Sequence, residues 1–101
     1  MNLSALDNNM FSQMSLRIIK EQELVIGPMA WDEARKVPGM QVVNSQSGEV
    51  SLRNGDPKVV IDGLVAQYER LFGRASHEVC REAVRDLIAQ MPAEEVPASL
   101  K

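Results

Sequence analysis

Cysteine, aromatic residues and long apolar runs are all scarce in this chain of 101 residues. The single cysteine, Cys80, excludes an internal disulfide and is typical of a protein from a reducing compartment. No stretch approaches the ~18 apolar residues that a membrane span requires. Residues 1–10 also lack the basic start and the continuous apolar run of a signal peptide. We therefore expect a cytoplasmic protein that does not bind a membrane.

A strong excess of one charge is also missing, since 11 Lys and Arg residues stand against 14 Asp and Glu residues. The net charge of −3 is spread along the chain without a basic arm or an acidic tail. Binding to a phosphate backbone needs a local excess of cations, so nucleic acid is disfavoured as the main partner. The remaining composition, 45% hydrophobic and 25% charged, is that of an ordinary globular domain.

The length suits one domain, whose core must be mainly aliphatic because the chain has only four aromatic residues. Polar residues near the start predict a flexible N-terminus at residues 1–9. A single globular domain is expected at residues 10–91, and Pro92 begins a C-terminal extension at residues 92–101.

Apolar residues at helical spacing, separated by glycine and proline, predict four helices. We expect these helices at residues 10–26, 29–37, 57–72 and 76–91. The third has the clearest limits, because Asp56 and Pro57 are typical of a helix start and Gly73 of a helix end. The short link at Gly73 pairs the last two helices as an αα-hairpin. Gly63 lies inside the third helix, where it costs about 1 kcal/mol relative to alanine and indicates a close helix–helix approach.

Two short β-prone runs, at residues 40–43 and 49–52, flank a loop of turn-forming residues and predict a β-hairpin. A two-stranded hairpin is only marginally stable alone, so it must pack on the helices or pair with a second copy. The expected fold is therefore a predominantly helical α+β fold. Its order is α-α-β-β-α-α, with a short β-hairpin and a C-terminal αα-hairpin.

The N-terminal helix has more apolar residues than one face can hold, namely Phe11, Met14, Leu16, Ile18, Ile19, Leu24, Val25 and Ile26. Self-association would bury the excess, and symmetric dimers are the commonest oligomers. Trp31, in the second helix, is a residue type enriched at binding hot spots. We expect a homodimer with contacts at Phe11, Met14, Ile18 and Trp31. The alternative is that the helix passes through the core of a single chain and that Trp31 anchors this core.

Catalytic and metal-binding patterns are weak in this sequence. His77 and Cys80 have the helical spacing at which a thiolate–imidazole pair can form. However, Cys80 lies on the apolar side of its helix, and a buried thiol is inert. Glu78 and Glu82 add metal-ligating groups, but the spacing matches no zinc pattern and a further Cys or His is missing. We therefore predict no catalytic residue, no metal and no cofactor.

Arg74, just before the last helix, and Arg81 and Arg85 within it form a loosely helical stripe and are candidate contacts for an anion or an acidic partner. Glu78 and Glu82 interleave with them at the spacing of surface ion pairs, so a solvated face is the competing interpretation. A helix-turn-helix formed by the last two helices would place the same arginines against DNA. The acidic residues of that helix would repel the phosphates.

These features favour a small, non-catalytic regulatory or adaptor protein that acts through protein–protein contacts. It would form a homodimer and take another protein as its target. The alternative is a dimeric DNA-binding transcriptional regulator that uses the C-terminal helix pair.

Overall fold

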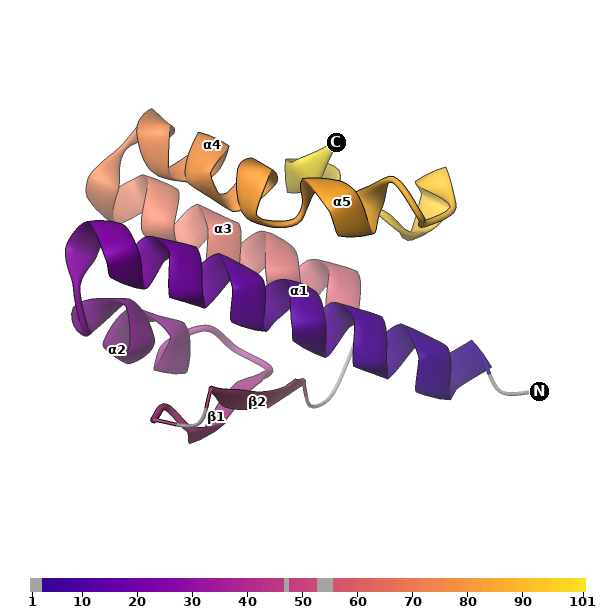
Figure 1. Ribbon diagram of the computed structural model, residues 1–101, viewed down its shortest axis with the longest axis horizontal. Helices are drawn as coiled ribbons and strands as arrows, with labels where there is room; N and C mark the ends of the chain where they lie inside the picture. The colour runs from indigo at the N-terminus through magenta and orange to yellow at the C-terminus, as the bar shows by residue number, and fades with distance from the viewer. Residues whose placement is uncertain (1–2, 47, 53–55) are drawn as a thin grey trace.

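The computed structural model describes residues 3–46, 48–52 and 56–101 of the chain. Its elements follow the predicted order, and the mostly helical α+β fold is confirmed. The helices are α1 (Leu3–Ile26), α2 (Met29–Arg35), α3 (Pro57–Phe72), α4 (Arg74–Ala83) and α5 (Arg85–Ile88) (Figure 1). The strands are β1 (Met40–Asn44) and β2 (Glu49–Leu52), and two 3-10 turns follow α5 as η1 (Ala93–Glu95) and η2 (Ala98–Leu100).

Helix α1 is the central element of the fold. It contacts α2 and β2 on one side and α3 and α4 on the other (Figure 1). Its inward side chains, Phe11, Met14, Ile18 and Ile19, are buried in the core. The helix thus passes through the core of a single chain. This was the alternative to self-association as an explanation for its excess of apolar residues.

The first helix is also longer than predicted, because it begins at Leu3 instead of residue 10. Residues 3–9, which we expected in a flexible N-terminus, therefore continue α1, while Met1 and Asn2 lie outside the described residues. Among the residues that the structure describes, no helix combines the length and the hydropathy needed to cross a membrane.

The predicted hairpin is confirmed, and it pairs within the chain. Strands β1 and β2 are antiparallel, with Met40 opposite Leu52 and Val42 opposite Val50. Met40 and Val50 are buried, so one face of this marginal unit lies on the helices. Ser47, in the loop between the strands, lies outside the described residues.

Helix α3 has the predicted limits. The Asp56 carboxylate accepts a hydrogen bond from the Lys58 amide at 2.9 Å, and Gly73 ends the helix with a φ of +92°. That φ lies in the left-handed region, which glycine adopts without strain. Helix α4 begins directly afterwards at Arg74, so Ser76 is buried inside the helix and does not cap it, contrary to the start at residue 76 that we predicted.

The prediction of one continuous helix over residues 76–91 is wrong, because the backbone breaks at Val84, where φ is −120°. Arg17 of α1 stabilises this break. Its guanidinium donates to the Ala83 carbonyl at 3.4 Å and to the Asp86 carboxylate at 2.6 Å. A carbonyl at a helix end needs a donor from elsewhere, and here the donor comes from a residue that is remote in the sequence.

The segment at residues 92–101, expected as an extension, folds back onto α3. Val96 and Leu100 are buried in the core. The Asp62 carboxylate of α3 accepts hydrogen bonds from the Ser99 amide at 3.0 Å and from the Ser99 hydroxyl at 2.5 Å. These contacts fix the segment beside α3 and α4, where it forms one wall of a groove.

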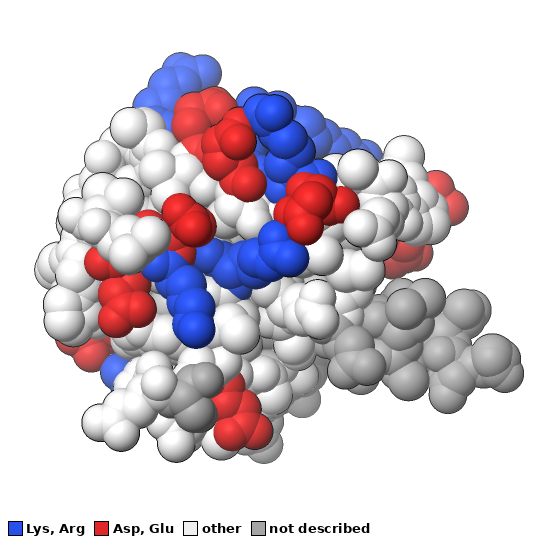
Figure 2. Space-filling view, viewed as in Figure 1, with Lys and Arg blue, Asp and Glu red and all other residues white. Residues whose placement is uncertain are grey.

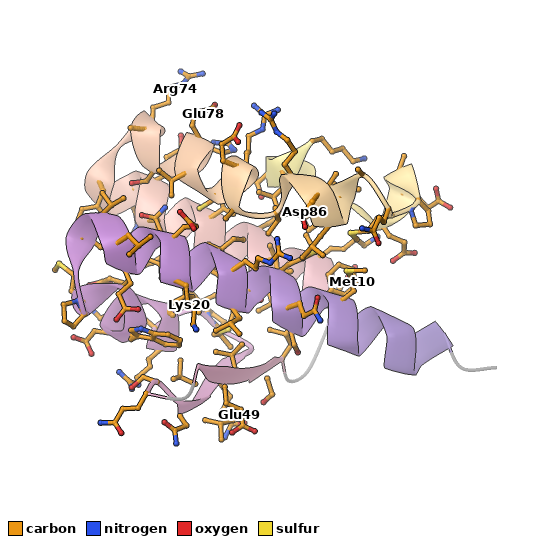
Figure 3. All side chains as sticks on the ribbon, viewed as in Figure 1. Met10, Lys20, Glu49, Arg74, Glu78 and Asp86 are labelled. Carbon is orange, nitrogen blue, oxygen red and sulfur yellow. The ribbon has the colours of Figure 1, made fainter. Side chains whose placement is uncertain are left out.

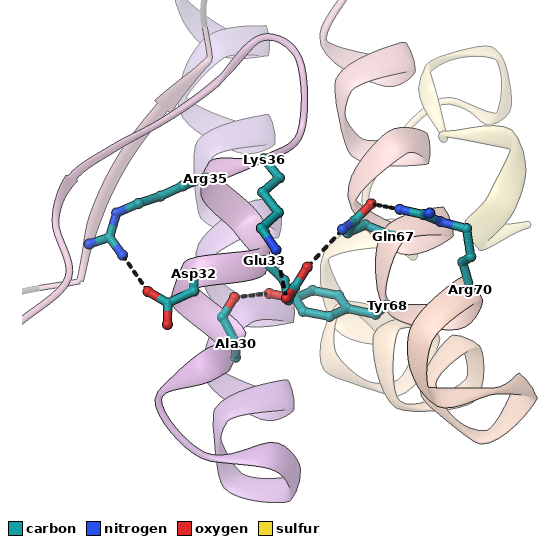
Figure 4. Close-up of polar contacts among 8 residues, drawn as sticks. All are labelled: Ala30, Asp32, Glu33, Arg35, Lys36, Gln67, Tyr68 and Arg70. Atoms are coloured by element: carbon teal, nitrogen blue, oxygen red, sulfur yellow. Dashed lines mark hydrogen bonds and ion pairs between the residues drawn. The ribbon is translucent and has the colours of Figure 1, made fainter.

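Polar side chains join α2 to α3 (Figure 4). The Glu33 carboxylate accepts hydrogen bonds from Gln67 at 2.8 Å and from Lys36 at 3.2 Å, and both contacts lower the pKa of Glu33. The buried Tyr68 hydroxyl donates to the Ala30 carbonyl at 2.6 Å. The bonds from Gln67 to Glu33 and from Tyr68 to Ala30 link residues distant in the sequence, so they set the position of α2 against α3.

Gly63 marks a close approach of α3 to the segment just after α2, and not to another helix as we predicted. A Cβ atom at Gly63 would lie 3.2 Å from Cγ1 of Val37. Since Val37 is buried, a larger residue at position 63 would have to displace a core side chain.

We expect Tyr68→Phe to lower the free energy of unfolding by about 1–2 kcal/mol. The substitution removes the hydrogen bond to the Ala30 carbonyl, while the ring still fills its space in the core. Urea unfolding followed by circular dichroism measures the change. A variant as stable as the parent protein would show that this bond contributes nothing to the contact between α2 and α3.

We also expect acid to destabilise the fold through Glu33. A carboxylate whose pKa is lower in the folded than in the unfolded chain adds stability above its unfolded pKa, and this stability is lost as the pH falls through the folded pKa. Glu33→Gln should therefore flatten the pH dependence of the unfolding free energy below about pH 5. Parallel curves for the parent and the variant, measured by urea unfolding at several pH values, would contradict this role.

Candidate functional site

The predicted dimer contacts lie inside the core of the single chain. Phe11, Met14 and Ile18 are at most 1% exposed, and Trp31 is 4% exposed. In this conformation they have no surface to offer a second chain. The physical reason is that α1 is covered by helices on one side and by α2 and the hairpin on the other.

A different set of apolar side chains is exposed, at the ends of three helices. Leu24 is 80% exposed, Val25 64%, Leu71 45% and Met29 44%. They lie at the end of α1, the end of α3 and the start of α2, which come together at one end of the molecule, on the left of Figure 1. We call these four residues the helix-end surface. Leu24 and Val25 belong to the apolar excess noted in the sequence, whereas nothing in the pattern singled out Met29 or Leu71.

The three candidate arginines do not act as one stripe. Arg81 lies 3.6 Å from the Glu78 carboxylate, and Arg85 pairs with Glu82. Figure 2 shows the resulting alternation of positive and negative side chains over α4 and α5. Arg74, at the first turn of α4, lies apart from the other two and points into solvent together with Glu78 (Figure 3).

Arg81 and Arg85 line a groove of about 510 Å³ between α4 and α5 on one side and the C-terminal segment on the other. We call it the C-terminal groove. Its apolar lining is buried or half-buried and consists of Ile88, Met91, Val96 and Leu100, with the exposed Ala93 beside them. Its charged lining is exposed and consists of Glu78, Arg81, Glu82, Arg85 and Lys101. The groove therefore has an apolar floor and a charged rim.

Sequence reasoning found two arginines of this rim but missed the floor. The available signal was the spacing of Val96 and Leu100, two apolar residues four positions apart in a segment that is otherwise mostly polar or proline. We interpreted this segment as an extension, and only its return onto α3 brings it opposite α4.

A second, mainly polar hollow of about 460 Å³ lies between α1, α2 and the loop after β1. Asp32 and Arg35 line it and form an ion pair at 3.1 Å. Trp31 also lines it, but this side chain is almost completely buried. The hollow therefore offers a ligand little apolar surface.

The side chains of the candidate nucleophilic pair are bonded to other residues. The Cys80 sulfur accepts a hydrogen bond from Gln22 at 3.4 Å, and burial raises the pKa of the Cys80 thiol to about 11. One nitrogen of His77 lies 3.1 Å from Glu69, and the other lies 2.5 Å from the Ser99 carbonyl. Within the described ranges, no three His, Cys, Asp or Glu side chains are grouped as a metal site.

We expect Cys80 to resist alkylation in the folded protein. Its side chain is fully buried, and a pKa of about 11 leaves very little thiolate near neutral pH. Iodoacetamide should therefore react at least about 100-fold more slowly with the native protein than with the urea-unfolded chain. Mass spectrometry of timed samples measures both rates, and similar rates would restore Cys80 as a candidate nucleophile.

No protein-family model, curated protein or solved structure matches this chain. A functional conclusion must therefore come from the chemistry of its own side chains. Two features differ from an ordinary solvated surface, namely the helix-end surface and the C-terminal groove.

Proposed function

We propose that this chain is a non-catalytic regulatory or adaptor protein of the cytoplasm that acts through protein–protein contacts. The helix-end surface carries this proposal, because four large apolar side chains are between 44% and 80% exposed there. Single exposed apolar residues are normal, but a group from three helix ends is typical of an interaction site.

A second copy of the same chain is the partner that this surface fits best. In a two-fold dimer each patch faces its own equivalent, and an apolar patch is complementary to itself without any matching charge. Leu24, Val25, Met29 and Leu71 then replace the four core residues as the proposed contacts. A further protein would bind to the surfaces that the dimer leaves open.

The environment of the reactive side chains supports a role without catalysis. A nucleophile needs a depressed pKa or an adjacent base, whereas Cys80 is buried with a raised pKa. His77 is held by Glu69 and by the Ser99 carbonyl, both of which attach it to the scaffold.

The DNA-binding alternative has less support from the charges. Arg81 and Arg85 each pair with a carboxylate on the same face, and the chain carries a net charge of −3. A DNA backbone presents many phosphates and needs a local excess of cations to bind them, which this face does not offer. The C-terminal helices also break at Val84, so the element that would enter the major groove is only the ten-residue α4.

We expect the parent protein to form a dimer that Val25→Lys weakens at least about tenfold, because a lysine from each copy would face its equivalent across the two-fold axis. A lysine near the end of α1 is favourable for the helix itself, so the fold should be retained. Light scattering on a sizing column at several concentrations measures the change.

Val59→Glu is the matched control. Val59 is 65% exposed, like Val25 at 64%, but it lies near the start of α3, where a carboxylate suits the helix. This variant should dimerise like the parent. A monomeric parent, or equal dissociation in both variants, would contradict the proposed surface.

A further inference from the structure

The C-terminal groove has walls that are fixed by contacts outside it. One wall is formed by α4 and α5, and the other by the segment that contains η1 and η2. Asp62 holds this segment through Ser99, and the Lys58 ammonium donates to the Glu94 carbonyl at 3.0 Å. A ligand would therefore enter a formed site and would not have to order the segment first, which favours binding.

The floor of the groove is aliphatic and adaptable. Ile88 and Met91 are half-buried, and Val96 and Leu100 complete the floor from the other wall. Methionine fills irregular spaces and is frequent at binding surfaces. A volume of about 510 Å³ lies within the range of small-molecule sites, and a flexible alkyl chain suits such a floor.

The rim of the groove carries charged side chains of both signs. They are three cations, Arg81, Arg85 and Lys101, and two carboxylates, Glu78 and Glu82. Both arginines are in exposed pairs, which contribute little to stability and can be exchanged for a new partner. Guanidinium groups bind carboxylates through two parallel hydrogen bonds.

We propose that the C-terminal groove binds a medium-chain aliphatic carboxylate, with its alkyl chain on the apolar floor and its head group at the arginines. The single negative charge of a carboxylate can be bound by one guanidinium group through two hydrogen bonds. A dianionic phosphate would face the additional repulsion of Glu78 and Glu82. This ligand site is separate from the helix-end surface and does not depend on dimer formation.

The test is a titration with octanoate, kept below the concentration at which it aggregates, and followed by ¹H–¹⁵N NMR of the parent protein. An alkyl carboxylate of this size should bind with a millimolar dissociation constant. Amide shifts should concentrate in residues 78–101. Octanol, which lacks the charge, and butanoate, which lacks the length, should each bind at least about fivefold more weakly.

Arg81→Gln/Arg85→Gln tests the role of the rim. Both side chains are exposed, so the fold should be retained, and circular dichroism checks this. The double variant should bind octanoate about tenfold more weakly than the parent. Arg74→Gln is the matched control, because Arg74 lies on the same helix but does not line the groove. It should bind like the parent.

Three results would overturn the proposal. These are shifts spread over the whole chain, equal binding of octanol and octanoate, or equal binding by the double variant and the parent. Val25→Lys, in which the dimer should be weakened, is expected to bind octanoate like the parent protein. Its octanoate affinity therefore separates a failure of the ligand site from a failure of the proposed dimer.

Discussion

The burial of α1 is the constraint on which the rest of the fold depends. Helix α2 has only seven residues and the sheet only two strands, and elements of that size are not stable alone in water. Both acquire their hydrophobic support from one side of α1, and the opposite side supports α3 and α4. A helix that serves two layers must be apolar on more than one face, which accounts for most of the excess seen in its sequence.

Polar side chains of α1 then decide where α4 and α5 lie. The buried Gln22 amide donates to the Ser76 carbonyl at 2.9 Å and to the Cys80 sulfur. Arg17 binds the end of α4 and the start of α5. Apolar packing tolerates several placements of a helix, whereas hydrogen bonds of fixed geometry select one of them. The cost is visible at Gln22, whose Oε1 is buried without a hydrogen-bond partner among the described residues.

The parts of this fold that could be predicted from the sequence are those set by local chemistry. Asp56, Pro57 and Gly73 define α3 through capping and backbone preference, and both signals act within a few residues. The break at Val84 is contacted by Arg17, which is remote in the sequence, so no window of local sequence contains this contact. The same limit applies to the groove. Arg74, Arg81 and Arg85 are at helical spacing in the sequence, but only Arg81 and Arg85 line the groove.

The arrangement of α4 separates the two surfaces that we consider functional. Its first turn follows Leu71 and Gly73 at the helix ends (Figure 1), whereas residues of its later turns line the groove. A dimer joined at the helix ends would therefore leave two identical grooves open. In each chain, the helix α4 connects the C-terminal groove to the helix-end surface where the two copies meet. Each groove would therefore keep its shape whether or not the helix-end surface is occupied.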